Sequence, residues 1–247
     1  MRMSEQSEAW GLTGIGAGNF VSEARLGPLI RSTGIGGGAI DFDLDGRPDV
    51  LVVGAGGTML ERDSQPNELM RNVGDRFARV TQASGAGDTG FGQGLAVGDY
   101  NEDGFPDLFF ANLGRNRLLR NNGDGTFTDC SDQLVGEDPR QWTTCGAFFD
   151  IDGDALTDLI TTNYCEVVDN LDGACRRSDG VLGPCHPLKF PADHDQYFVG
   201  TPAGELEDVT SRWMPPVSPG RGLGILAGSL AGDEIGILIA NDMSSNE

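Results

Sequence analysis

Short apolar segments alternate with acidic, glycine-rich turns along most of this 247-residue chain. The runs GGGAI and VLVV enclose a turn at 41–49, GLAVG and LFFAN enclose one at 99–107, and CGAFF and LITTN enclose one at 150–158. Apolar runs of four or five residues that are bounded by turn signals are typical of β-strands. Each acidic turn is therefore predicted to join two strands into a hairpin.

A second hairpin is predicted after each of these three. The stretch NRLLRNNGDGTFTDC at 116–130 places the turn residues NNGDG between two alternating runs. Residues 67–81 and 196–210 repeat this element. Each unit is then four short antiparallel strands, and the acidic turns begin 58 and 51 residues apart. These periods suit the four-stranded blades of a β-propeller.

The predicted fold class is therefore all-β, a partial propeller of about four blades. Residues 1–35 are expected to form a lead-in and a partial blade, and residues 36–247 the repeats. An insert at 164–195 separates the two hairpins of the third unit. The fourth unit begins at Gly222, and its turn at 229–237 has lost most of its acids, so we expect no ion there.

The acidic turns place side-chain oxygens at alternate positions. Four carboxylates within about 4 to 5 Å of one another repel by several kcal/mol per pair, so the turns need a cation. Ca²⁺ accepts six to eight oxygen ligands, whereas zinc and copper prefer His or Cys. We predict about three Ca²⁺ sites, with a backbone carbonyl at the seventh position of each turn. The expected ligands are Asp41, Asp43, Asp45, Arg47 and Asp49, then Asp99, Asn101, Asp103, Phe105 and Asp107, and then Asp150, Asp152, Asp154, Leu156 and Asp158.

These turns differ from EF-hand loops, which need a glutamate at position 12, where this chain has Val52, Phe110 or Thr161. They also differ from one another. Asn101 is a neutral ligand, and Ala155 stands where the other turns have a glycine. On ligand charge, the turn at 41–49 is expected to bind Ca²⁺ most tightly.

Composition narrows the possible partners. The formal net charge of −21 excludes nucleic acid and anionic membrane surfaces, which carry the same sign. The 38 glycines are about twice the average usage and fit many tight turns. No run of eighteen apolar residues occurs, so no membrane insertion is predicted. The first residues, MRMSEQSEAWGLTG, contain no signal peptide.

The D-x-D-x-D-G-x-x-D turns, the NRLLRNNGDGTF hairpin, the ANDMSSNE ending and the C-H-P sequence at 185–187 together resemble a known family. They are similar to FG-GAP or VCBS repeats of integrin-alpha-like propellers, and more closely to the ASPIC/UnbV and cartilage acidic protein group. The resemblance covers about residues 20–247. It implies a Ca²⁺-binding propeller, usually larger than this one, whose faces bind other molecules and which brings no catalytic residues. It also implies a secreted, periplasmic or cell-surface location, so we expect a truncated chain.

The five cysteines bear on the same question of location. Spacings of nine residues between the cysteines of the insert differ from the C-x₂₋₄-C of structural zinc sites. We therefore expect a disulfide between Cys175 and Cys185. A zinc site that includes His186 and His194, or free thiols, are the alternatives. The pairing of the other cysteines stays open: Cys130, Cys145 and Cys165.

The predicted function is non-catalytic: a calcium-binding extracellular propeller segment that mediates adhesion to a protein or a glycan. The alternative is a carbohydrate-active enzyme, a glycosidase or lyase on the same scaffold, because acidic pairs serve glycoside chemistry. Aromatic side chains are candidates for stacking on sugars, although such residues more often fill the gaps between blades. The aromatic candidates are Trp10, Trp142, Trp213 and Tyr197.

Two other chemistries are excluded by pattern. GIGGGAID at 34–41 precedes a strand instead of following one, and no helix opens after it, so it is no dinucleotide site. The chain has two histidines and no serine in a nucleophile elbow, so a hydrolytic triad is not expected.

Overall fold

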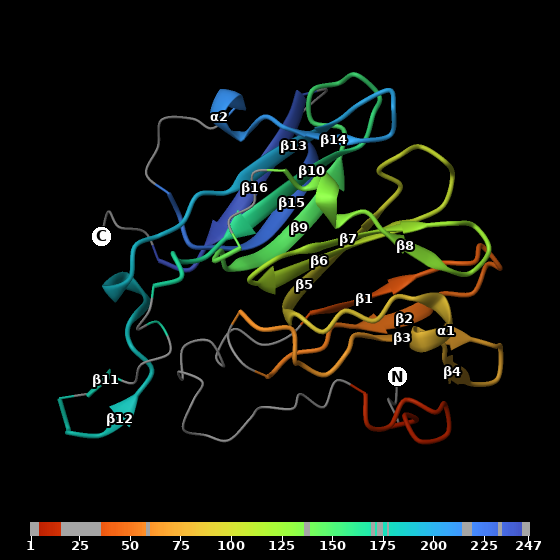
Figure 1. The fold of residues 1–247 in the computed structure, drawn as a ribbon, viewed down its shortest axis with the longest axis horizontal. Helices are drawn as coiled ribbons and strands as arrows, with labels where there is room; N and C mark the ends of the chain where they lie inside the picture. Colours follow the sequence, from red (N-terminus) through yellow and green to blue (C-terminus); the bar gives the residue numbers. More distant parts are fainter. Residues whose placement is uncertain are drawn as a thin grey trace.

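The computed structural model describes residues 5–15, 36–57, 60–135, 139–168, 171, 175–176, 178–213, 219–231 and 234–243. Within this part of the chain, three four-stranded antiparallel sheets follow one another, and a two-stranded sheet comes after them (Figure 1). The all-β prediction of four-stranded blades in a partial propeller is confirmed. None of the helices in the described residues is long and apolar enough to cross a membrane.

We call the three four-stranded sheets blades 1, 2 and 3. Blade 1 consists of β1 (Gly37–Ile40), β2 (Asp49–Val52), β3 (Glu68–Asn72) and β4 (Phe77–Arg79). Blade 2 consists of β5 (Phe91–Gly98), β6 (Asp107–Leu113), β7 (Arg117–Asn121) and β8 (Phe127–Asp129). Blade 3 consists of β9 (Thr143–Phe149), β10 (Asp158–Asn163), β13 (Gln196–Gly200) and β14 (Leu206–Asp208). Their strand order is sequential, with β13 beside β10, so each predicted pair of hairpins forms one sheet.

A short helical turn follows the fourth strand of each blade, and a hydroxyl at its start accepts a hydrogen bond from a backbone N–H of the third strand. The turns are α1 (Thr81–Ser84), η2 (Ser131–Gln133) and α2 (Thr210–Trp213). The donors are Leu69 at 2.9 Å, Leu118 at 3.1 Å and Tyr197 at 3.0 Å. Because the same contact recurs three times, it belongs to the repeat.

Strand β6 shows how the blades stack, because all of its residues are buried. Successive side chains of a strand point to opposite faces. Leu108 and Phe110 accordingly join the apolar cluster shared with blade 1, and Phe109 and Ala111 join the cluster shared with blade 3. The core is thus divided into layers between neighbouring sheets, as the face-to-face stacking of propeller blades requires.

The first strands of neighbouring blades approach one another closely through glycine. A Cβ atom on Gly94 of β5 would lie 2.3 Å from the carbonyl oxygen of Thr144 in β9. A Cβ atom on Gly36 would lie 2.9 Å from the Cα atom of Gly94. These contacts explain why the glycine runs precede the acidic turns, where they let the inner strands of the blades touch.

The insert carries β11 (Cys175–Arg176), β12 (Leu182–Gly183) and η3 (Pro187–Lys189), and its β11–β12 hairpin extends away from the sheets in Figure 1. Cys175 and Cys185 form a disulfide, which confirms the predicted pairing. The disulfide makes these two thiols unable to bind zinc, so the zinc alternative loses two of its three candidate cysteines. The remaining cysteines are unpaired in the structure: Cys130, Cys145 and Cys165.

The fourth unit differs from its prediction. Strand β15 (Gly222–Ala231) pairs with β16 (Glu234–Asn241) as far as Ala231 opposite Glu234, so the two strands run through most of the expected turn at 229–237. Where the acids are missing, this backbone extends the ladder instead of forming the wide turn. Residues 232–233 lie outside the described residues, as do residues 16–35 of the expected partial blade.

Candidate metal centres

The three acidic loops share one backbone conformation. In each loop the fourth and sixth positions have positive φ, in the left-handed region. Each loop has a glycine at one of these positions and a residue with a side chain at the other, so the third loop keeps the conformation although its glycine has moved. The φ values are 55° and 81° for Leu44 and Gly46, 57° and 91° for Glu102 and Gly104, and 81° and 70° for Gly153 and Ala155.

The first aspartate of each loop holds the turn closed. Asp41 accepts hydrogen bonds from the N–H groups of Asp45, at 3.0 Å, and Gly46, at 2.9 Å. The same aspartate in the other loops also accepts two backbone N–H groups. Asp99 accepts those of Asp103 and Gly104, and Asp150 accepts those of Gly153 and Ala155. This carboxylate therefore fixes the bend before any ion binds.

The last aspartate of each loop ties the loop to the third strand of its blade. Asp49 accepts the N–H groups of Phe42, at 3.2 Å, and Asn72, at 2.7 Å. Asp107 does so with Tyr100 and Asn121, and Asp158 with Ile151 and Gly200. All three carboxylates are fully buried. Burial raises the pKa of each of them, that of Asp107 to about 7, because the charged form loses its water.

Two loops bring three carboxylates close enough to share one ion. Oxygens of Asp41, Asp43 and Asp49 lie within 4.8 Å of one another, and so do those of Asp150, Asp152 and Asp154. Oδ1 of Asp43 is buried and has no hydrogen-bond partner among the described residues. An all-oxygen donor set with an unpartnered buried oxygen fits a hard cation such as Ca²⁺.

The middle loop is arranged differently. The side-chain amide of Asn101 donates to Asp103 at 2.9 Å, so these two predicted ligands satisfy each other in part. Among the acids that the structure describes, Asp99, Asp103 and Asp107 do not form a third close group. The neutral ligand at position 101 thus gives the loop an internal hydrogen bond where the third loop has a carboxylate.

Two arginines lie against the first loop. Arg71, from β3, places its guanidinium 2.5 Å from Asp43 and 3.4 Å from Asp45. Arg47 lies 2.8 Å from Asp45. Burial raises the pKa of Asp45, but the N–H and guanidinium groups of Arg47, with the charge of Arg71, outweigh this and lower it.

Sequence reasoning named Arg47 only for its carbonyl and missed Arg71. The loop spacing alone could not show Arg71, because it arrives from the neighbouring strand through the pairing of Val50 with Met70. The backbone-carbonyl ligands stay a prediction: Arg47, Phe105 and Leu156.

The aromatic candidates differ in burial. Trp142 is fully buried, donates its indole N–H to Gln93 at 3.1 Å, and packs on Tyr164 with ring centroids 4.9 Å apart. Trp10 is 38% exposed and contacts Phe77 of β4. The expectation that such residues fill gaps in the fold holds for Trp142.

Comparison with known proteins agrees with this geometry. The FG-GAP-like repeat family model matches residues 41–110 and 99–161, which hold all three acidic loops. Human cartilage acidic protein 1 is 30% identical over 107 residues, which are 43% of this chain and 16% of that protein. The chain thus spans a small part of the length of this relative. Residues 41–161, with their three acidic loops, are thus identified as FG-GAP-like repeats.

Proposed function

We propose that this chain is a calcium-stabilised segment of an extracellular β-propeller that binds protein or glycan and has no catalytic site. The observation that carries the proposal is that the first aspartate of all three acidic loops accepts the backbone N–H five residues further on, and that each loop is in phase with a blade. The acidic side chains of these loops offer oxygen atoms as metal ligands, which favours Ca²⁺ over zinc or copper.

The extracellular part of the proposal has two supports. The disulfide between Cys175 and Cys185 is typical of oxidising compartments. The matched relative is named for cartilage, a tissue that consists largely of extracellular matrix. Loops that are ordered by Ca²⁺ suit such a setting, because extracellular modules work with dissociation constants of about 0.1 to 1 mM.

Thermal unfolding tests the role of calcium. With a dissociation constant near 0.1 mM, about 1 mM Ca²⁺ stabilises the fold by about 1.4 kcal/mol per occupied site. We expect Ca²⁺ to raise the melting temperature and a chelator to reverse the effect, while Mg²⁺ at the same concentration gives a smaller change. A melting temperature that changes neither with Ca²⁺ nor with the chelator would refute the proposal.

The non-catalytic part is tested separately. A glycan array reports saturable binding, and an assay for released reducing sugar reports turnover on the same glycans. We expect no turnover. Release of sugar above the rate of a boiled control would instead support the glycosidase or lyase alternative.

A further inference from the structure

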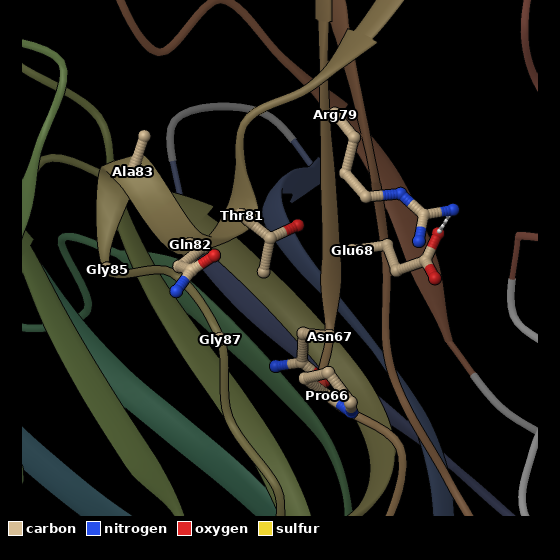
Figure 2. Close-up of a pocket in the computed structure, with 9 residues that line it drawn as sticks. All are labelled: Pro66, Asn67, Glu68, Arg79, Thr81, Gln82, Ala83, Gly85 and Gly87. Atoms are coloured by element: carbon tan, nitrogen blue, oxygen red, sulfur yellow. Dashed lines mark ion pairs between the residues drawn. The ribbon is translucent and has the colours of Figure 1, made fainter.

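Each blade has a pocket at the start of its third strand, at the opposite end from its acidic loop. The pocket of blade 1 has a volume of about 790 Å³ and is lined by residues of β3, β4 and α1, which Figure 2 shows. The pocket of blade 2 has a volume of about 440 Å³, and that of blade 3 about 540 Å³. These volumes are in the range of small-ligand sites.

The strand registers show that the three pockets are copies of one feature. Arg79 lies opposite Met70, Asp129 opposite Leu119, and Asp208 opposite Phe198, at the same place in each blade. The first residue of each third strand faces this position across the pocket. These first residues are Glu68, Arg117 and Gln196.

In blades 1 and 2 this pair of positions forms an ion pair. Glu68 and Arg79 are 3.1 Å apart in blade 1, the contact drawn as a dashed line in Figure 2. Arg117 and Asp129 are 2.6 Å apart in blade 2, so the signs are exchanged but the pair is kept. A guanidinium belonging to the chain therefore lines both pockets and pairs with an acid there.

Blade 3 lacks this guanidinium. Gln196 replaces the charged first residue, and none of the ion pairs in the described part of the chain includes Asp208. Gln196 is only 9% exposed, and its Oε1 has no hydrogen-bond partner among the described residues. A buried acceptor without a donor costs free energy, so the pocket is incomplete by itself.

The rest of the blade 3 pocket is acidic. Four carboxylates line it, together with the imidazole of His194 and the guanidinium of Arg140, which donates to the carbonyl of Val167 at 3.1 Å. Burial raises the pKa of Asp195 to about 6, which a bound cation would reverse. The four acids are Glu166, Asp193, Asp195 and Asp208.

The ligand that this lining needs carries both positive charge and N–H donors. No three of these acids have oxygens within 4.8 Å of one another, as the acids of the first and third acidic loops do. The four carboxylates are therefore poorly placed to coordinate a single metal ion. An amide oxygen beside spread carboxylates instead suits a group with several N–H donors.

We propose that the pocket of blade 3 binds the ammonium or guanidinium group of a lysine or arginine side chain from a partner protein. The group takes the place that Arg79 and Arg117 occupy in the other blades. That the group comes from a protein rests on the binding function proposed above. The charge of −21 on the chain favours the approach of such a basic segment.

Calorimetry on the whole chain, with Ca²⁺ present, tests this with acetylated tri-lysine and tri-arginine amides and with spermidine as a non-peptide cation. We expect one of the peptides to saturate a single site and to bind more tightly than spermidine. Gln196→Arg, which restores the ion pair of blade 2, and Asp208→Asn should each weaken this binding by about tenfold or more.

The matched control is Glu207→Gln. Glu207 is an exposed acid on the same strand whose side chain points to the other face, so the variant loses the same charge outside the pocket. Its peptide affinity should stay within about twofold of the parent. Equal weakening by Glu207→Gln would show attraction to the net charge alone and would overturn the proposal, as would saturable binding of spermidine without the peptides.

The calcium-dependent melting shift is measured on the same samples. Pocket variants that lose the peptide but keep this shift support the pocket assignment and show that they are folded. Absence of peptide binding with the shift intact refutes the pocket alone, whereas absence of the shift refutes the calcium role.

Discussion

Blade 1 and blade 3 share the backbone hydrogen bonds of the last aspartate of the loop but differ in how their negative charges are compensated. At the acidic loop of blade 1, Arg71 lies against Asp43 and Asp45. The register of β13 places Val199 at the equivalent position in blade 3. None of the ion pairs among the described residues includes an acid of the loop of blade 3. The loop of blade 1 is thus partly neutralised by its own chain, and that of blade 3 is not.

The opposite ends of these blades show the same difference. Blade 1 pairs Glu68 with Arg79, whereas blade 3 has Gln196 and Asp208. The hydrogen bonds to backbone N–H groups therefore define the repeat, and charge compensation varies from blade to blade. Among the described residues, blade 3 thus lacks the ion pairs that blade 1 has at both ends, and we infer that it relies more on cations from outside the chain.

The largest expected effect is the loss of stability when the last aspartate of an acidic loop is removed, and it should be equal in blades 1 and 3. Asp49→Ala and Asp158→Ala each leave two backbone N–H groups of a buried tie without an acceptor. We expect each to lower the free energy of unfolding by about 2 to 3 kcal/mol in the presence of chelator. Denaturant titration measures both. A loss in one blade only would show that the tie is not a shared element of the repeat.

The next largest effect concerns the calcium-dependent melting shift, which should respond differently to substitutions in blade 1 and blade 3. Asp152→Ala should remove more of the calcium-dependent melting shift than Asp43→Ala, because Arg71 already competes for Asp43. The expected loss for Asp152→Ala is about 1.4 kcal/mol, or about 3 to 6 °C, at 1 mM Ca²⁺. This order reverses the one expected from ligand charge alone. An equal or greater loss for Asp43→Ala would restore that earlier order.

Exchanging the arginines at the loop of blade 1 for the apolar residues of blade 3 tests directly whether these arginines weaken Ca²⁺ binding. Arg47→Leu with Arg71→Val gives the first loop the side chains that Leu156 and Val199 provide in blade 3. We expect its Ca²⁺ affinity to rise by about fivefold at low salt, and the gain to shrink as salt screens the arginines. Val199→Arg should have the opposite effect on the third loop. Calorimetry at two salt concentrations measures both, and a gain that is independent of salt would count against the electrostatic explanation.

The smallest effect concerns Asp195, which stands where blades 1 and 2 have Asn67 and Asn116. Each of these side chains accepts the N–H at the end of the second strand. Because the folded pKa of Asp195 is raised to about 6, its contribution is present below pH 4 and is lost as the pH rises through 6. Asp195→Asn should therefore stabilise the protein by about 0.5 kcal/mol above pH 6, a figure discounted for solvent screening.

Melting temperatures between pH 4 and pH 8 test this shift. The curves of the parent and Asp195→Asn should diverge as the pH passes about 6. Asn67→Asp is the converse variant and should add pH dependence to blade 1. Parallel curves would contradict the assignment.

The repeat was predictable because its signals are local. The D-x-D-x-D-G turns, the NNGDG turn and the alternating runs fixed the hairpins, and the glycine runs indicated the inner strands. The cysteine spacing likewise indicated the Cys175–Cys185 disulfide, which the structure contains.

The features that could not be predicted from the sequence depend on contacts between segments that are far apart in the chain. The contact of Arg71 with Asp43 crosses strands, and the pocket of blade 3 is built from several separate segments. The continued pairing of β15 with β16 was also not predicted, because the spacing of acids cannot indicate the backbone conformation of a loop that has lost its acids.

Asn121 joins the first two loops. Its backbone N–H donates to Asp107, and its side-chain amide donates to the carbonyl of Phe42, inside the loop of blade 1, at 2.8 Å. The corresponding position in blade 3 is Gly200, which donates its backbone N–H to Asp158 but has no side-chain amide. Ordering of either of the first two bends is therefore transmitted to its neighbour, so we expect these two loops to bind ions cooperatively. The third loop contacts the second through an exposed hydrogen bond, from the hydroxyl of Thr157 to Glu102 at 2.7 Å, so we expect weaker coupling there.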